Sequence, residues 1–327
     1  MAPAKYSPTA YARLSVVTAI GVLALKLGAW KLTGSVGLLS DALETCTNLG
    51  GALMALLMLR LAAEPPDEEH AYGHSKAEYF SSGFEGMLIF LAAGFIAAAA
   101  LPRLLAPQAL QKPDIGLGVA AVATVINFVV ARVLARAGRA HGSISLTADS
   151  RHLMVDVWTT IGVIVGVALA ALTGWLWLDP LVALLVAVHV LWEGFSLLRE
   201  SAMGLMDVAW PEDEQKILLQ VLDEFRAENA AGNASGKIRG NIDFHALRTR
   251  RSAAHRFVDF HVLVPGEWSV QQGHDLVERI ERRLSERLPH LTAFTHLEPL
   301  EDPASYGDEG LDRFDRECRG RAAGSAA

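Results

Sequence analysis

The chain has 327 residues, a formal net charge of −7 and a hydrophobic content of 51%. The negative balance and the lack of a basic stripe in the sequence argue against a nucleic-acid partner, because duplex binding relies on clustered positive charge. The two cysteines, Cys46 and Cys318, provide neither a disulfide framework nor a CxxC metal motif. The N-terminus lacks a signal-peptide cleavage pattern, so we expect its first apolar run to remain as a membrane span.

Long apolar segments occupy the first two thirds of the chain. Each approaches the roughly 20 residues that a helix needs to cross about 30 Å of hydrocarbon. We therefore predict a short segment at 1–10 and then a six-helix transmembrane domain over 11–208. The six predicted spans are residues 11–33, 36–62, 79–105, 115–138, 146–173 and 178–204.

Lys and Arg flank these spans unevenly, and an even number of spans leaves both termini on one side. One side has Lys5, Arg13, Arg60, Lys76, Arg132, Arg136, Arg139 and Arg199, and the other has Lys31, Arg103 and Lys112. The positive-inside rule therefore predicts a multi-pass protein of the inner (plasma) membrane with both termini in the cytoplasm.

Residues 209–302 are charged and are predicted to form a cytoplasmic α+β domain. Apolar periodicity predicts helices over 211–229 and 269–288, and strands over 244–250, 257–264 and 292–297. His261 falls on the strand face opposite Val258 and Phe260. Residues 303–327 show no period and are predicted to be disordered.

Polar residues lie inside two of the spans, where a charge costs about 2.5 kcal/mol or more. They are Asp41, Glu44, Thr45 and Asn48 along one face of the second span, and His152 and Asp156, four apart, in the fifth. Interhelical hydrogen bonding is the simpler interpretation of Thr45 or Asn48 taken alone. For the whole set, a divalent cation is the direct way to keep facing carboxylates ionised, so we predict a metal site between the two helices.

Two further ionisable residues lie inside spans without a firm assignment. Lys26 in the first span either snorkels or pairs with a carboxylate. Glu85 in the third span is either a protonated packing residue or a partner of a metal ligand. No phosphate-cradling loop or nucleophile motif supports an enzyme.

Residues 66–78, Pro-Asp-Glu-Glu-His-Ala-Tyr-Gly-His-Ser-Lys-Ala-Glu, resemble the D-x-x-H-x-Y-G-H-x-K-x-E signature of the cation diffusion facilitator family. Residues 148–156, Ala-Asp-Ser-Arg-His-Leu-Met-Val-Asp, resemble its fifth-helix ligand pair. The chain over 11–300 is similar to the bacterial zinc and ferrous-iron efflux branch of this family, including its metallochaperone-like cytoplasmic domain. The resemblance implies a homodimer in the lipid bilayer that exchanges cytoplasmic Zn²⁺, Fe²⁺ or Mn²⁺ for protons by alternating access, with no cofactor beyond transported and regulatory ions.

The resemblance also implies a set of transport-site ligands. Asp41, His152 and Asp156 match family ligands, whereas Thr45 stands where zinc-type relatives have a fourth ligand, an Asp. Glu44 or Asn48 would then supply the missing group. A longer carboxylate or an amide would favour Fe²⁺, Mn²⁺ or a higher coordination number over tetrahedral zinc.

Two other groups of candidate ligand residues resemble metal sites that the family has outside the membrane. Asp67, His70 and His74 resemble a peripheral site in the loop between the second and third spans. His245, His261, His274, His296 and Glu298 are similar in position to the family's cytoplasmic zinc cluster, with Glu298 where relatives have an Asp.

Two alternatives to a transporter remain at this stage. A metal-gated channel would share the intramembrane ligands but would conduct without proton exchange. A membrane-anchored metal sensor or assembly scaffold would use the spans only as an anchor.

Overall fold

The computed structural model describes residues 6–33, 36–105, 115–175, 177–234, 241–307 and 309–311. The chain forms two compact units, Met1–Met206 and Asp207–Ala327, and each is described by itself.

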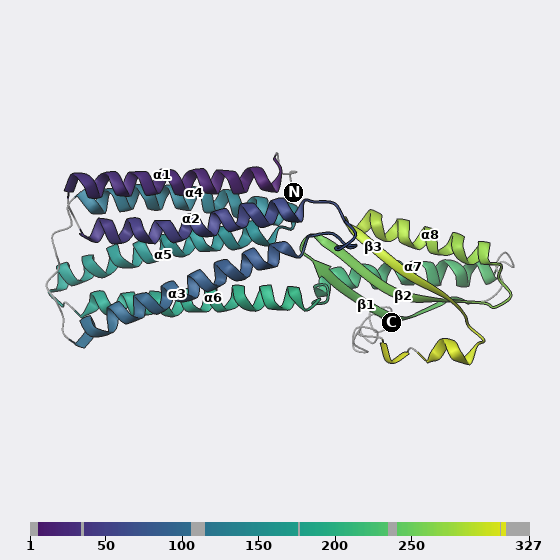
Figure 1. Cartoon of the computed structure of the whole chain (residues 1–327). Coiled ribbons are helices and arrows are strands. Elements are labelled where there is room, and N and C mark those ends of the chain that lie inside the picture. The colour runs from purple at the N-terminus through teal and green to yellow at the C-terminus, as the bar shows by residue number, and fades with distance from the viewer. Residues whose placement is uncertain are drawn as a thin grey trace. The chain divides into compact units, whose positions relative to one another are not determined.

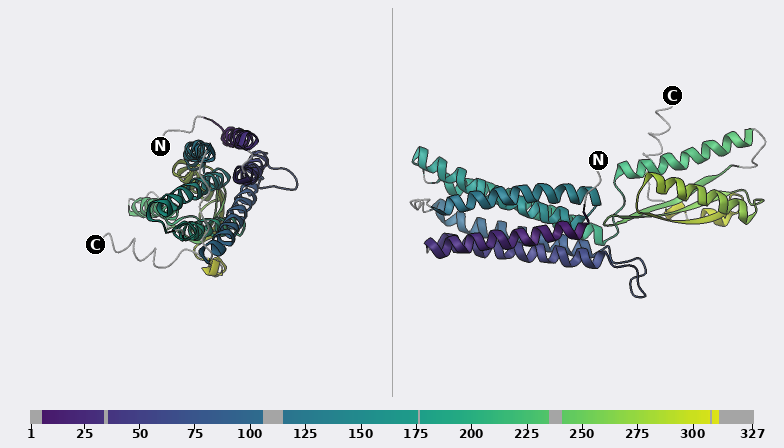
Figure 2. Two further views of the ribbon diagram at one scale, coloured as in Figure 1. Left: turned by 90° about the vertical axis from the view of Figure 1, so that its left-hand side faces the viewer. Right: turned by 90° about the horizontal axis from the view of Figure 1, so that it is seen from above.

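The first unit is a bundle of long helices that run side by side (Figures 1 and 2). They are α1 (Pro8–Thr33), α2 (Val36–Ala62), α3 (Ala77–Leu105), α4 (Ile115–His141), α5 (Ile144–Thr173) and α6 (Leu178–Leu205). Each begins and ends within a few residues of a predicted span, so the six predicted helices are confirmed.

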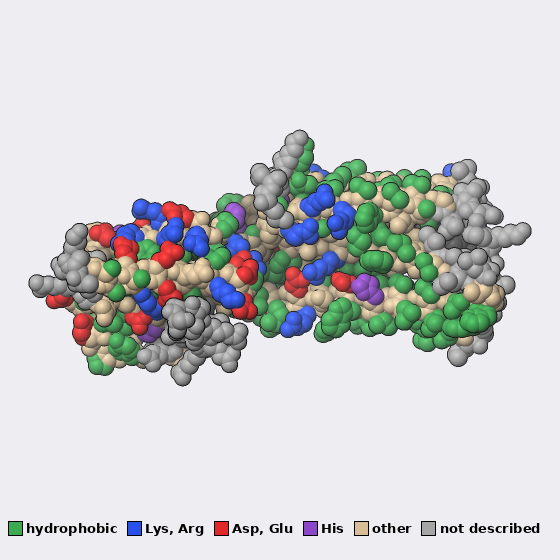
Figure 3. Space-filling model, turned by 180° about the vertical axis from the view of Figure 1, so that it is seen from behind, with side chains coloured by type: hydrophobic (Ala, Val, Ile, Leu, Met, Phe, Trp, Pro, Cys, Tyr) green, Lys and Arg blue, Asp and Glu red, His purple; other side chains and the backbone are tan. Residues whose placement is uncertain are grey.

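The surface of this bundle suits lipid. Four helices, α1, α3, α4 and α6, are long and apolar enough to cross a membrane, and α2 adds a shorter apolar stretch, Asn48–Ala62, among the residues described. Phe95, Val188 and Trp192 are 74%, 67% and 68% exposed. Figure 3 shows this unit covered mainly by hydrophobic side chains, with Lys and Arg gathered towards one end. Exposed apolar area on this scale is unfavourable in water and is expected in hydrocarbon.

Helix α5 lies at the centre of the bundle, since it contacts α1, α2, α3, α4 and α6. Helices α3 and α6 pack especially closely. A Cβ added at Gly194 would lie 2.8 Å from the backbone nitrogen of Phe90, and one at Gly86 would lie 3.0 Å from that of Leu198. Small residues let helix backbones approach in a membrane, where van der Waals packing drives association.

The second unit is an α+β domain with every helix and strand that the sequence predicts. Its elements are α7 (Glu212–Ala234), β1 (Asp243–Ser252), β2 (His255–Val264), α8 (Val270–Arg287) and β3 (Leu291–Pro299). The sheet has the order β1-β2-β3, with β1 antiparallel to β2 and β3 parallel to β2 through the crossover helix α8. Ser269 caps α8 by accepting from the backbone N–H of Gln272, as part of a capping box.

The core of this unit lies on one face of the sheet, which α7 and α8 cover (Figure 1). Phe244 and Phe260 pack edge to face with ring centroids 6.1 Å apart, and Leu222 and Ile280 from the helices are fully buried beside them. Because side chains alternate along a strand, His261 points to the opposite face, which the helices leave open.

The prediction of disorder from residue 303 is wrong for its first residues. Pro303–Tyr306 and Glu309–Leu311 form the short 3₁₀ turns η1 and η2. The Ser305 hydroxyl donates to the Pro299 carbonyl at 2.8 Å, and the Tyr306 hydroxyl donates to that of Leu300 at 2.8 Å. Local hydrogen bonds, which leave no periodic signal, order this stretch. Residues 312–327 lie outside the described part of the chain.

One histidine of this unit gives its stability a dependence on pH. His255 begins β2, and its ring centroid lies 5.7 Å from that of His290. His255 is exposed overall, but partial burial of its ring, together with the nearby His290, holds the pKa of His255 below its ordinary value of 6.5. The unfolded chain therefore binds this proton more readily, so the contribution of His255 is fully present above its unfolded pKa and is lost as the pH falls towards the lowered folded pKa.

We therefore expect the unfolding free energy of His255→Gln to fall less than that of the parent as the pH drops below about 6.5, as measured by urea denaturation of the full chain in detergent. His274→Gln is the control, because His274 is exposed on α8 and should leave the parent's pH dependence in place. A parental slope in His255→Gln would contradict the expectation.

Candidate metal sites

A polar cluster connects α2 and α5 inside the bundle. Nε2 of His152 lies 2.8 Å from Oδ1 of Asn48, and the Asn48 amide nitrogen donates to the carboxylate of Asp156. His152 and Asn48 are 6% and 8% exposed. His152 and Asp156 are four residues apart on α5, so both face α2. The structure therefore brings together one imidazole, one carboxylate and one amide, which are all metal-binding groups.

The other predicted residues of α2 have different outcomes. The side chains of Asp41 and Glu44 lie outside the described residues, so their roles stay predictions. Thr45 is buried, but its hydroxyl accepts from Nζ of Lys26 on α1 at 2.8 Å. Thr45 therefore bonds to α1, and Asn48 reaches the α5 pair, among the α2 side chains that the structure describes.

A small cavity of about 30 Å³ lies beside this cluster, lined in part by Lys26, Asn48 and Asp156. A volume of this size holds a single water or ion. The sequence predicts that Lys26 either snorkels or pairs with a carboxylate. In the structure its side chain is buried, and it donates to the Thr45 hydroxyl instead of reaching the membrane surface.

The predicted loop residues also come together, between α2 and α3. Asp67 Oδ1 lies 3.3 Å from Nδ1 of His70, and Asp67 Oδ2 lies 3.3 Å from Nε2 of His74. One ligand atom from each residue falls within 4.8 Å of the others. The His70 backbone N–H, which donates to Oδ1 at 2.6 Å, holds the pKa of the Asp67 carboxyl below its ordinary value of 3.8, with the two imidazoles adding to the effect. An ionised carboxylate between two imidazoles suits a divalent cation.

The cytoplasmic histidines lie in one row across the sheet. His245, His261 and His296 are register partners on β1, β2 and β3. Glu298 lies two residues beyond His296 and so on the same face of β3. Its Oε2 is 2.9 Å from Nε2 of His245 and 3.1 Å from Nδ1 of His261, and its Oε1 is 3.5 Å from Nε2 of His296.

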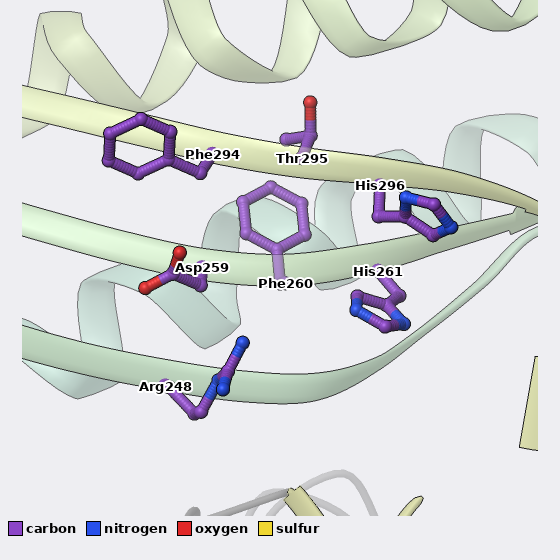
Figure 4. Close-up of a pocket in the computed structure, with 7 residues that line it drawn as sticks. All are labelled: Arg248, Asp259, Phe260, His261, Phe294, Thr295 and His296. Atoms are coloured by element: carbon purple, nitrogen blue, oxygen red, sulfur yellow. The ribbon is translucent and has the colours of Figure 1, made fainter. Parts of the chain in front are cut away.

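His296 is at the rim of this cluster. It is 67% exposed, whereas Glu298 and His261 are each 12% exposed. Ligand atoms of His245, His261 and Glu298 lie within 4.8 Å of one another. Figure 4 shows His261 and His296 on neighbouring strands beside a hollow of about 280 Å³. His274, on α8, is not part of this grouping among the described residues.

Comparison with known proteins decides the family. The family model described as "Cation efflux transmembrane domain" matches residues 12–206, from near the start of α1 to the end of α6. The model described as "Cation efflux protein, cytoplasmic domain" matches residues 229–300. The chain belongs to the cation diffusion facilitator family. It is therefore a multi-pass membrane protein of a family of cation transporters rather than enzymes.

Full-length relatives agree with this assignment. The chain is 49% identical over 296 residues to the uncharacterized transporter sll1263 of Synechocystis sp., covering 90% of this chain and 92% of the relative. It is 29% identical over 307 residues to the cation-efflux pump FieF of Serratia proteamaculans, covering 92% and 96%. It is 30% identical over 278 residues to FieF of Yersinia pestis, covering 85% and 88%. A solved structure of CzrB in its zinc form, described as a proposed zinc transporter, is 29% identical and covers 29% of this chain and 93% of its own, with a TM-score of 0.21.

Proposed function

We propose that this protein exports a divalent transition-metal ion, Zn²⁺, Fe²⁺ or Mn²⁺, from the cytoplasm in exchange for protons by alternating access. The observation that supports this best is the buried cluster of Asn48, His152 and Asp156 between two helices of a membrane domain. Relatives across nearly the whole chain are named cation-efflux pumps. Intramembrane ionisable residues mark ion pathways by default.

The chemistry of the cluster couples metal to protons. An imidazole or a carboxyl group must lose its proton to bind a metal, so an arriving metal expels protons and arriving protons expel the metal. Asn48 links His152 to Asp156 by hydrogen bonds. The same three side chains would exchange these bonds for bonds to the cation.

The ligand set also bears on which metal is carried. The α2 residue that reaches the α5 pair is an amide, and an amide oxygen is a harder ligand than an imidazole. The carboxylate of Asp41 would be a further ligand, and Glu44 would add a second carboxylate if it also reaches the site. Such an oxygen-rich set favours Fe²⁺ or Mn²⁺ relative to a strictly tetrahedral zinc site.

We also propose a homodimer in the inner membrane with both termini in the cytoplasm. The excess of Lys and Arg that flanks one set of span ends in the sequence supports this orientation. The match to the family's cytoplasmic domain supports the dimer. Light scattering of the detergent-solubilised chain would give its mass, and cysteine labelling from each side of the membrane would give its orientation.

Proteoliposomes test the function itself. The purified chain should take up Zn²⁺, Fe²⁺ or Mn²⁺ when a pH gradient is imposed, and uptake should fall when the gradient is collapsed. Metal flux that does not depend on the pH gradient would indicate a metal-gated channel. A chain truncated at residue 209 should keep some flux if the protein is a transporter. A membrane-anchored sensor or scaffold would show no flux even at full length.

We propose that the cytoplasmic cluster binds a regulatory metal ion and that Glu298 is central to it. Because Glu298 contacts all three histidines of the row, Glu298→Ala is expected to remove about one bound Zn²⁺ per chain, as measured by equilibrium dialysis with elemental analysis. His274→Ala, on the exposed side of α8, is the matched control and should bind as the parent does. Parental stoichiometry in Glu298→Ala would contradict the assignment.

A further inference from the structure

Glu85 of α3 lies against the imidazole of the α2–α5 cluster. Its side chain is fully buried, and its Oε2 lies 3.1 Å from Nδ1 of His152. The N–H bond of Nδ1 does not point at Oε2, so the contact is not a regular hydrogen bond. Within the described part of the chain, Nδ1 of His152 and both carboxylate oxygens of Glu85 make no other hydrogen bond. A buried carboxylate without hydrogen bonds is costly, so its retention calls for a specific reason.

Helix α2 leaves space for this carboxylate. A Cβ added at Gly51 would lie 2.5 Å from Oε1 and 2.8 Å from Oε2 of Glu85, closer than real Cβ atoms come to other atoms. A Cβ added at the preceding Gly50 would meet nothing within 4 Å. Gly51 therefore lets the Glu85 carboxylate reach its position beside His152, whereas Gly50 faces open space.

The imidazole ring thus lies between two partners on different helices. Nε2 faces Asn48 of α2, and Nδ1 faces Glu85 of α3. Only a ring nitrogen without a proton can bind a metal, and the partner of one nitrogen determines which nitrogen is free. Oδ1 of Asn48 can only accept, so its contact with Nε2 also calls for a proton on Nε2. When the Glu85 carboxylate accepts from Nδ1–H, Nε2 is the nitrogen that gives up its proton to bind a metal on the side where Asn48 and Asp156 lie.

We propose that Glu85 is a positioning residue for the transported cation: its carboxylate accepts from Nδ1–H of His152 and directs Nε2 of that ring at the ion. This inference rests on the proposed function and extends it to a third helix, since it ties α3 to the α2–α5 site. A slight turn of the ring, or of the carboxylate in the space beside Gly51, aligns the contact when the ion is bound.

The test measures KM for metal uptake in proteoliposomes. Loss of an outer partner of a metal-binding histidine typically lowers metal affinity by about 10- to 100-fold, so Glu85→Ala should raise KM by that order. Glu85→Gln keeps an oxygen that accepts from Nδ1–H and should recover a large part of the loss. If Glu85→Gln is as impaired as Glu85→Ala, the carboxylate binds the ion itself and the positioning role is overturned.

Glycine variants supply an independent test that leaves the carboxylate in the chain. Gly51→Ala should raise KM by displacing the Glu85 carboxylate, and Gly50→Ala should leave KM at the parental value. Adding Gly51→Ala to Glu85→Ala should cause no further change, because the clash no longer exists. Additive effects in the double variant would overturn the proposal.

A spectroscopic readout separates positioning from simple packing. In the metal-loaded parent, ¹⁵N shifts of the His152 ring should show the proton on Nδ1, and in Glu85→Ala this preference should be lost. If the parent transports metal and Glu85→Ala keeps the parental KM, the positioning role of Glu85 is overturned while the proposed transport function stands. If the parent transports none of the metals, the proposed function fails with it.

Discussion

Replacing Asp156 by alanine is expected to lower pH-driven metal uptake by about 100-fold or more. Losing a residue that only hydrogen-bonds to a metal ligand lowers metal affinity by about 10- to 100-fold. Asp156 is proposed to bind the metal directly, so its loss should have a larger effect. The substitution also leaves the Asn48 amide without the acceptor that it has on α5. Uptake would be followed in proteoliposomes with the parent beside the variant.

A carboxylate elsewhere in the same unit serves as the control. Glu200 pairs with Arg151 at 2.9 Å, but the two side chains are 43% and 33% exposed. Exposed ion pairs contribute only about 0–1 kcal/mol, so Glu200→Ala should transport as the parent does. Undiminished uptake by Asp156→Ala would falsify the assignment of the transport site.

The second large effect concerns stability rather than transport. Phe260→Ala is expected to destabilise the cytoplasmic unit by about 3–5 kcal/mol, the usual cost of emptying a buried phenylalanine site. Phe260 is 1% exposed and packs edge to face on Phe244 between the sheet and the helices. Urea denaturation of the full chain, followed by tryptophan fluorescence, to which Trp210 and Trp268 of this unit contribute, would measure the change.

The neighbouring strand offers a matched aromatic control. Phe294 on β3 is 40% exposed and lies on the open face of the sheet (Figure 4). Its replacement by alanine should cost less than about 1 kcal/mol, because surface substitutions usually have small effects. Equal destabilisation by the two substitutions would show that the core does not lie where the buried residues place it.

The helices of both units could be predicted from sequence because their signals are local. A run of apolar residues long enough to cross hydrocarbon has few alternatives to a helix, and the bounds of α2 match the prediction at both ends. The cap at Ser269 and the apolar period after it likewise predict α8. The turns η1 and η2 were missed, since a few local hydrogen bonds order them without any repeating pattern.

The cytoplasmic cluster could be predicted only in part. Alternation places His261 on the open face of β2, and this follows from sequence. The row that it forms with His245 and His296 depends on strand register: the β1–β2 pair has an irregularity between His245 and Arg248, and β3 pairs in parallel with β2. Register is a long-range property, so no local pattern predicts it.

The site between the membrane helices could also be predicted from sequence only in part. The sequence by itself determined that Thr45, Asn48, His152 and Asp156 are polar at membrane depth and that each pair shares a helix face. At 3.6 residues per turn, residues three apart are still separated by roughly 60° around the helix. Only the packing of neighbouring helices decided that Thr45 meets Lys26 on α1 while Asn48 meets His152 on α5. It also decided that Glu85 of α3 reaches the other side of that imidazole, because contacts between helices depend on their rotation and on small residues such as Gly51.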